Sequence, residues 1–217
     1  MKKIILFILT AIIIAFPIFY LLGNISFSKP FNCQQSEKPI PLINKKIIQS
    51  FIAFHDNISV LSIKPATYTK TVRAKILFAI KDTRGNLIYT TEKNTIFIED
   101  NKFYKLKIPK NNLSKNNLYF LEISYSQAPK TPIGFWATSE NCYEGDLFLG
   151  KEKKENSDLL LIQKYSEDSF WANAKELLNR ISQYKPLWLK GWKILALFFV
   201  YLSFIFLLVA IFIRKIF

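Results

Sequence analysis

Two long apolar runs, one at each end of the chain, constrain the fold of this sequence more than any other feature. The first extends from Ile4 to Leu22 and the second from Ile194 to Ile213, and neither contains a charged residue. Each run reaches the roughly 20 residues that a helix needs to span the hydrocarbon of a bilayer. A buried core helix is the other way to house such a run, but two at opposite ends of one chain favour transmembrane helices, in residues 1–23 and 188–217.

Positive charges beside the runs predict an orientation. Lys2 and Lys3 precede the first run, and Arg214 and Lys215 follow the second. Because cationic residues beside transmembrane helices stay in the cytoplasm, we expect a double pass through the cell (inner) membrane. Both termini would then be cytoplasmic and the central domain extracytoplasmic.

Tryptophan and lysine side chains gather just before the second run. Such side chains favour the boundary between hydrocarbon and headgroups, so four residues are expected to be membrane-interface anchors: Trp188, Lys190, Trp192 and Lys193. The lysines among them would by themselves favour the reverse orientation. The first run also fits a cleaved secretory signal, in which case the second helix is the sole anchor.

Between the runs, short β-rich stretches alternate with turn residues, a spacing typical of a sandwich or barrel. Residues 24–46 contain three prolines and no periodic apolar pattern, which predicts an extended connector. Apolar side chains alternate clearly in residues 74–80 and 119–125, as strands with one wet face require. Residues 166–187 change to helical spacing. The predicted fold class is therefore mainly β: a jelly-roll-like antiparallel β-sandwich over 47–165 with one amphipathic helix, flanked by the two transmembrane helices.

Charge and cysteine content narrow the partners. The net charge of +14 favours anionic neighbours, so we expect the lipid bilayer or an anionic envelope polymer as partners, and no nucleic acid for an exported domain. Cys33 and Cys142 are the two cysteines. In an exported domain they permit one disulfide, with two unpaired thiols as the alternative.

Enzyme signatures are sparse. His55 is the single histidine, and metalloprotease, nucleophile-elbow and phosphate-loop motifs are missing, which predicts no enzyme, no cofactor and no metal. Two carboxylate pairs, Glu144 with Asp146 and Glu99 with Asp100, are the nearest candidates for acid–base chemistry. Both pairs sit in turn sequences, where such residues serve the backbone, and loop oxygens of this kind can also hold Ca²⁺.

Sugar binding has the better physical case, in residues 133–148. Aromatic faces can pack on the apolar C–H faces of a sugar ring while amides and carboxylates bond its hydroxyls. The candidate glycan-binding residues are Phe135, Trp136, Glu140, Asn141, Tyr143 and Asp146. The alternative is that these aromatic residues belong to the core.

Five short segments carry a family resemblance: Ser62–Tyr68, Asp82–Asn86, Ile98–Tyr104, Tyr119–Ile123 and Asp158–Leu160. Together they are similar to extracytoplasmic jelly-roll, carbohydrate-binding-like modules that accompany bacterial membrane glycosyltransferases and other envelope polysaccharide proteins. The resemblance covers roughly Phe51 to Tyr165. It implies a β-sandwich that touches glycan or lipid-linked sugar, with a multi-span membrane glycosyltransferase as a partner.

The expected function is therefore that of a membrane-anchored, non-catalytic glycan-binding or accessory module in cell-envelope glycan assembly. The alternative is a scaffold or assembly subunit of a membrane protein complex, in which the sandwich contacts protein rather than sugar.

Overall fold

The computed structural model describes residues 13, 16–17, 20–28, 37–43, 46–70, 72–110, 112–127, 129, 131–183, 185–186 and 192–216. The chain divides into two compact units. One unit comprises residues 1–26 with residues 166–217, and the other is the β unit, Phe27–Tyr165.

Thirteen strands and one short 3₁₀ helix make up the described β unit. In chain order they are β1 (Phe27–Ser28), β2 (Glu37–Pro41), β3 (Ile47–Ile52), β4 (Ile58–Ile63), β5 (Pro65–Ala66), β6 (Lys75–Asp82), β7 (Leu87–Asn94), η1 (Thr95–Phe97), β8 (Tyr104–Lys107), β9 (Leu118–Gln127), β10 (Gly134–Thr138), β11 (Leu147–Leu149), β12 (Glu152–Lys154) and β13 (Leu161–Tyr165).

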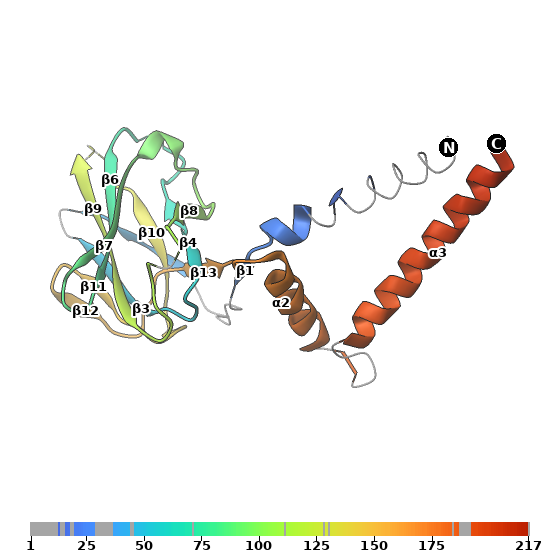
Figure 1. Ribbon diagram of the computed structural model, residues 1–217. Helices are drawn as coiled ribbons and strands as arrows, with labels where there is room; N and C mark the ends of the chain where they lie inside the picture. The colour runs from blue at the N-terminus through green and yellow to red at the C-terminus, as the bar shows by residue number, and fades with distance from the viewer. Residues whose placement is uncertain are drawn as a thin grey trace. The chain divides into compact units, whose positions relative to one another are not determined.

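The strands form two layers, as Figure 1 shows. One layer is a six-stranded sheet in the order β12-β11-β3-β9-β6-β7. The other contains a four-stranded sheet, β1-β13-β4-β8, and a three-stranded sheet, β2-β10-β5. These two sheets are joined at β10, where the Trp136 N–H donates to the Lys64 carbonyl (2.8 Å) and the Trp136 carbonyl accepts from the Leu160 N–H (2.9 Å). All the strand pairs described are antiparallel, so the prediction of a mainly β, antiparallel sandwich is confirmed.

The core lies between the two layers. Ile76, Phe78 and Ile80 of β6 are fully buried, as the alternation in residues 74–80 predicts. From β10, the Phe135 ring meets Phe78 edge-on, with ring centroids 6.4 Å apart. Contact of this kind between residues of opposite layers is the packing that holds a sandwich closed.

Two strands lie within residues 24–46, the stretch interpreted as an extended connector. β1 pairs with β13, and β2 pairs with β10 along its whole length. Pro39 and Pro41 fit in β2 because it is an edge strand of its sheet, and a proline on an edge forfeits only a hydrogen bond that would face outward. The prolines therefore marked an edge strand.

Two helices follow the sandwich: α2 (Phe170–Gln183) and α3 (Trp192–Ile216). In α2, the Arg180 guanidinium pairs with Glu176 one turn earlier, at 2.8 Å. Exposed large apolar side chains on α3 include Leu197, Val200 and Phe204.

Within the residues that the structure describes, no helix combines the length and the apolarity that crossing a membrane demands. The predicted fold class with two flanking transmembrane helices is corrected on this finding, and so is the double-pass localisation with an extracytoplasmic centre. The prediction relied on counting consecutive uncharged residues, and such a count does not by itself establish a helix that crosses a bilayer. Most of residues 1–23 lies outside the described residues.

Candidate functional site

Phe135 and Trp136 are neighbours in β10 but belong to different environments. Side chains alternate between the faces of a strand, so Phe135 points inward and is 1% exposed, whereas Trp136 points outward and is partly exposed. The position of Phe135 is therefore corrected from a ligand contact to a core residue. Of the two aromatic residues of β10 that were predicted to contact sugar, Trp136 is the one that reaches the surface.

Polar groups from three other segments fix the Trp136 ring. Its Nε1–H donates to the Asn101 side-chain oxygen at 2.7 Å. The Lys64 ammonium lies 5.0 Å from the ring centroid, within the range of a cation–π interaction. Lys64 in turn pairs with Glu37 of β2. The indole is thus held in one orientation by an amide, a cation and that cation's carboxylate partner.

A second aromatic side chain lies beside β10. Tyr68 is 42% exposed, and its hydroxyl is 2.9 Å from the place that a Cβ of Gly134 would occupy. The missing side chain at Gly134 therefore makes room for the phenol. Positions 134 and 136 share one face of the strand, so Tyr68 and Trp136 flank the same short stretch. We call these five residues the Trp136 surface: Trp136, Tyr68, Asn101, Lys64 and Glu37.

The loop that presents Tyr68 is held by a carboxylate. Tyr68 and Thr69 have φ of 55° and 60°, a left-handed conformation that costs free energy in residues with a Cβ. Asp100 accepts hydrogen bonds from the N–H groups of Thr67 (2.6 Å) and Thr69 (3.3 Å). Glu99, its neighbour, pairs instead with Lys102. The carboxylates of the suggested acid–base pair Glu99 and Asp100 thus have separate partners, and Asp100 has a structural role.

The remaining predicted sugar contacts lie on the loop after β10. Glu140 and Asn141 are exposed, and Asp146 pairs with Lys153 at 2.7 Å. Tyr143 is tied inward, because its hydroxyl donates to the Leu159 carbonyl at 2.7 Å. Burial, together with the charge of Asp158, raises the pKa of Tyr143 well above the usual tyrosine value.

A buried polar network anchors this loop, and it was not predicted from the sequence. Asp158 and Gln49 are both 0% exposed. The Gln49 amide donates to Asp158 Oδ1 at 2.9 Å and accepts from the Leu159 N–H at 2.8 Å. The N–H groups of Cys142 and Tyr143 donate to Asp158 Oδ2 at 2.7 and 3.4 Å. Burial raises the pKa of Asp158, opposed by these hydrogen bonds.

A sequence signal for this network does exist. Gln49 lies two residues from Ile47 and two from Phe51, which are core residues. Strand alternation alone therefore places the Gln49 amide in the core. A buried amide needs hydrogen-bond partners, although the pattern does not say which residue supplies them.

Cys142 is disulfide-bonded. Cys33 lies outside the described residues, so its pairing with Cys142 stays a prediction.

A shallow groove of about 370 Å³ crosses the outer face of the six-stranded sheet. Ile48, Phe120 and Phe148 supply its apolar lining, and Lys81, Asp82 and Glu122 its charges. Glu122 lies between two lysines, at 3.0 Å from Lys81 and 3.4 Å from Lys46, so its own charge is neutralised.

Other sequence candidates have structural surroundings. The His55 ring stacks on Tyr165 at 3.9 Å, and its Nδ1 accepts from the Asn57 N–H at 3.0 Å. In the described part of the chain, no three His, Cys, Asp or Glu residues stand close enough to share a metal ion.

The predicted interface anchors are only partly described. Trp188 and Lys190 lie outside the described residues, as does the side chain of Trp192, and Lys193 is exposed in the first turn of α3.

Comparison with known proteins places the chain in no family. Neither a family model nor a curated protein matches the sequence. Two solved structures that resemble it are of infectious bursal disease virus. The VP2 subviral particle is 13% identical, with a TM-score of 0.21, and the match covers 64% of this chain and 36% of that chain. The Gt strain structure is 12% identical, with a TM-score of 0.19, and the match covers 64% and 38%.

The chain therefore spans little more than a third of either viral protein. A likeness with such TM-scores carries no argument, so the fold rests on the strand pairing of this chain alone. Of the predicted resemblance to jelly-roll modules, the β-sandwich fold is observed, and the family is not shown.

Proposed function

We propose that this protein is a non-catalytic glycan-binding module whose ligand contacts the Trp136 surface. The observation that carries the proposal is a partly exposed indole fixed by Asn101 and Lys64, with the exposed phenol of Tyr68 on the same stretch of β10. Ligand sites combine aromatic walls with a few placed polar groups. A sugar ring needs such a set, because it has apolar C–H faces and a rim of hydroxyls.

The ordering of the site favours binding. A ligand loses affinity when it has to immobilise rotamer-rich side chains. Here the indole is already held by its Nε1–H bond, and the Tyr68 loop is held by Asp100. The Asn101 amide donates one N–H to Asp100 at 3.0 Å. Its second N–H and the second carboxylate oxygen of Glu37 remain for hydroxyl groups.

Partnered carboxylates support a non-catalytic role. Glycoside cleavage uses two carboxylates that flank the scissile bond, one as an acid and the other as a base or nucleophile. At the Trp136 surface, Glu37 pairs with Lys64, and Asp100 accepts two backbone N–H groups. Glu37 and Asp100 are therefore not arranged as the acid and the base of such a reaction.

Oligosaccharide binding by the full-length chain tests the proposal. We expect saturable binding that Trp136→Ala weakens by about tenfold or more, the scale of a lost central aromatic contact. Phe97→Ala is the matched control, since Phe97 is an aromatic residue with 78% exposure on η1, and it should bind as the unaltered chain does. No saturable oligosaccharide binding, or equal binding by Trp136→Ala, would overturn the proposal.

A second candidate function is contact with a protein partner, as a scaffold subunit. The groove on the six-stranded sheet supports it, since Ile48, Phe120 and Phe148 are partly exposed there. A partner that co-purifies with the full chain, is lost on Phe148→Asp and is retained on Trp136→Ala would favour this function. That the partner is a membrane glycosyltransferase remains a prediction of the sequence resemblance.

A further inference from the structure

The outer face of the four-stranded sheet has an unusual charge composition. Its strands β1, β13, β4 and β8 contain no aspartate or glutamate but three lysines. The strand register places Lys164 opposite Val60, and Val60 opposite Lys107. Lys105 lies two residues from Lys107, opposite Ser62. We call Lys105, Lys107 and Lys164 the lysine face.

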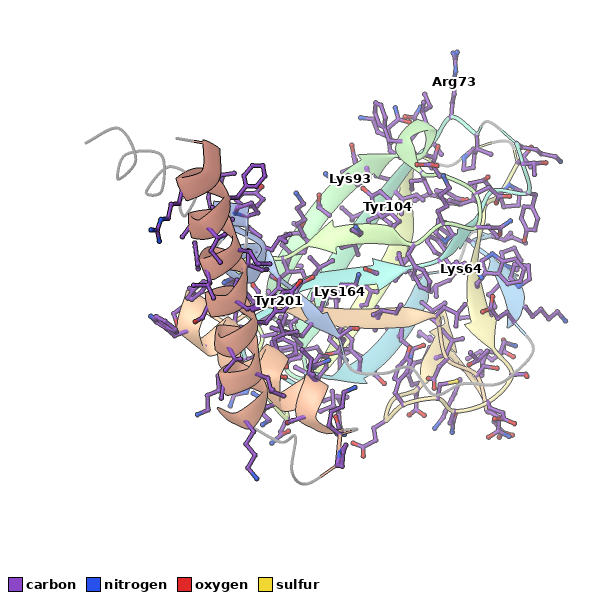
Figure 2. All side chains as sticks on the ribbon, turned by 90° about the vertical axis from the view of Figure 1, so that its right-hand side faces the viewer. Lys64, Arg73, Lys93, Tyr104, Lys164 and Tyr201 are labelled. Carbon is purple, nitrogen blue, oxygen red and sulfur yellow. The ribbon has the colours of Figure 1, made fainter. Side chains whose placement is uncertain are left out.

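The lysine face points away from the core. Leu61 and Ile63 alternate with Val60 and Ser62 along β4 and are buried core residues, as is Leu106 between the two lysines of β8. Figure 2 views the sheet from the outer side, with Lys164 and Lys64 labelled.

In the part of the chain that the structure describes, the lysine face has no paired carboxylate. Within the described residues, none of its three lysines takes part in an ion pair. The six-stranded sheet differs, because four of the five lysines in its strands are paired: Lys75 with Glu92, Lys81 with Glu122, Lys153 with Asp146 and Lys154 with Glu152. Uncompensated positive charge on one face attracts anions to that face.

A buried hydroxyl lies in the middle of the same face. Ser62 is 1% exposed, and its Oγ has no hydrogen-bond partner in the described part of the chain. Its register neighbours are Lys105 on β8 and Ile162 on β13. A buried hydroxyl without a partner is uncommon, and an anionic oxygen held by Lys105 would be an acceptor for it.

The lysine face is continuous with the Trp136 surface. Val60, Ser62 and Lys64 follow one another at every second position and so share a face of the chain, and Lys64 is the cation beside the Trp136 ring. From strand geometry, the combined surface extends roughly 13 Å along the β4 direction and roughly 10 Å across three strands. That area accommodates more than one sugar unit.

We infer that the ligand of this protein is an acidic glycan, which extends from Trp136 over the lysine face with its anionic groups beside Lys105, Lys107 and Lys164. The inference rests on the proposed function and names the chemical class of its ligand. Single-stranded nucleic acid fits the face less well, because base stacking uses successive aromatic platforms. The outward side chains of β4 and β13 between the lysines are Val60, Ser62 and Ile162, and none of these is aromatic.

The experiment uses the full-length chain and two forms of one oligosaccharide: oligogalacturonate, which carries carboxylates, and its fully methyl-esterified, neutral form. The test variant is Lys105→Gln/Lys107→Gln/Lys164→Gln. The matched control, Lys93→Gln/Lys115→Gln/Lys151→Gln, removes the same charge from exposed lysines elsewhere. Thermal unfolding of each variant, together with its binding of the neutral form, establishes that it is folded.

The acidic form should bind the unaltered chain more tightly than the neutral form. The test variant should lose about tenfold or more of that affinity, with a flatter dependence on salt, while the control variant stays within about twofold. Binding of the neutral form should be unchanged in both variants and lost on Trp136→Ala. Ser62→Ala should weaken binding of the acidic form alone.

The failures of the two proposals are distinguishable. Binding of both forms with equal affinity, dependent on Trp136, would overturn the acidic-glycan inference and leave the proposed function standing. Failure of both forms to bind would overturn both. If the test and control variants lose equal affinity for the acidic form, net charge alone accounts for the loss and the inference is overturned. So would tighter, lysine-face-dependent binding of oligo-dT or of vesicles containing phosphatidylglycerol.

Discussion

The two layers of the sandwich share one core but differ in how the charges on their outer faces are paired. The six-stranded sheet pairs Lys75, Lys81, Lys153 and Lys154 with nearby carboxylates. The four-stranded sheet leaves Lys105, Lys107 and Lys164 without such partners in the described chain. An exposed ion pair contributes little to stability, so pairing is not what the fold requires. The difference is therefore better explained by what each surface meets in solution.

The net charge of +14 indicates an anionic partner but does not say where on the surface that partner binds. The strand register does, because it separates lysines that already have a counter-charge from lysines that do not. Four predictions, at Asp158, Gly134 and Glu122, can break or sharpen the comparison.

The largest effect is expected where the two layers are tied together. Asp158, just before β13, accepts from Gln49 of β3 in the opposite layer. Asp158→Ala would remove the acceptor of the Cys142 N–H and one of the two acceptors of the buried Gln49 amide, which keeps only the Ser50 carbonyl. We therefore expect a loss of about 3–5 kcal/mol in unfolding free energy. Denaturant unfolding measures it, with Glu155→Ala as the exposed control. A loss below about 1 kcal/mol would show that the layers do not depend on this tie.

The same carboxyl predicts a pH dependence. Burial raises the pKa of Asp158 above the ordinary value of 3.8 in the folded protein, so the folded state holds this proton more tightly than the unfolded chain. The proton's contribution to stability is then fully present below pH 3.8 and is lost as the pH rises through the raised value. The unfolding free energy of the unaltered chain, minus that of Asp158→Asn, should fall across this window. A difference that rises with pH instead would mean that the hydrogen bonds outweigh burial.

A smaller effect is expected at Gly134, beside Trp136. An alanine Cβ there would stand 2.9 Å from the Tyr68 hydroxyl and 3.0 Å from the Ile40 carbonyl oxygen. Gly134→Ala should cost about 1–3 kcal/mol and weaken oligosaccharide binding, because Tyr68 has to move. Adding Tyr68→Phe removes the hydroxyl and should restore part of the stability, as thermal unfolding can show. A double variant no more stable than Gly134→Ala would place the strain at Ile40 instead.

Strand alternation explains which parts of this fold the sequence could predict. The faces of residues 74–80 and 119–125 were predictable, since each alternates apolar with polar residues. Phe135 and Trp136 were not separable in that way, because both are aromatic and their neighbours in β10 are small or apolar. Only the pairing of β10 with its neighbours tells which ring is inside.

Long-range contacts account for what the sequence could not show. Gln49 and Asp158 are 109 residues apart, and no spacing rule links a buried amide to its partner at that distance. The lysine face has the same origin, since Lys107 and Lys164 meet only through the register of β8, β4 and β13. The two apolar runs at the chain ends were the most conspicuous signal, and the inference of a double-pass membrane protein drawn from them was wrong.

The smallest effect on stability is expected at Glu122, and it tests the comparison directly. Its carboxylate, with 17% side-chain exposure, neutralises both Lys46 and Lys81. Glu122→Gln should change the unfolding free energy by about 1 kcal/mol or less, yet it leaves two adjacent lysines without a counter-charge. If unpaired lysines alone make an anion-binding surface, this variant should gain a second site for oligogalacturonate, measurable as a higher stoichiometry in calorimetry. If the stoichiometry is unchanged, binding at the four-stranded sheet requires more than charge, and its register, Ser62 and Trp136 supply the specificity.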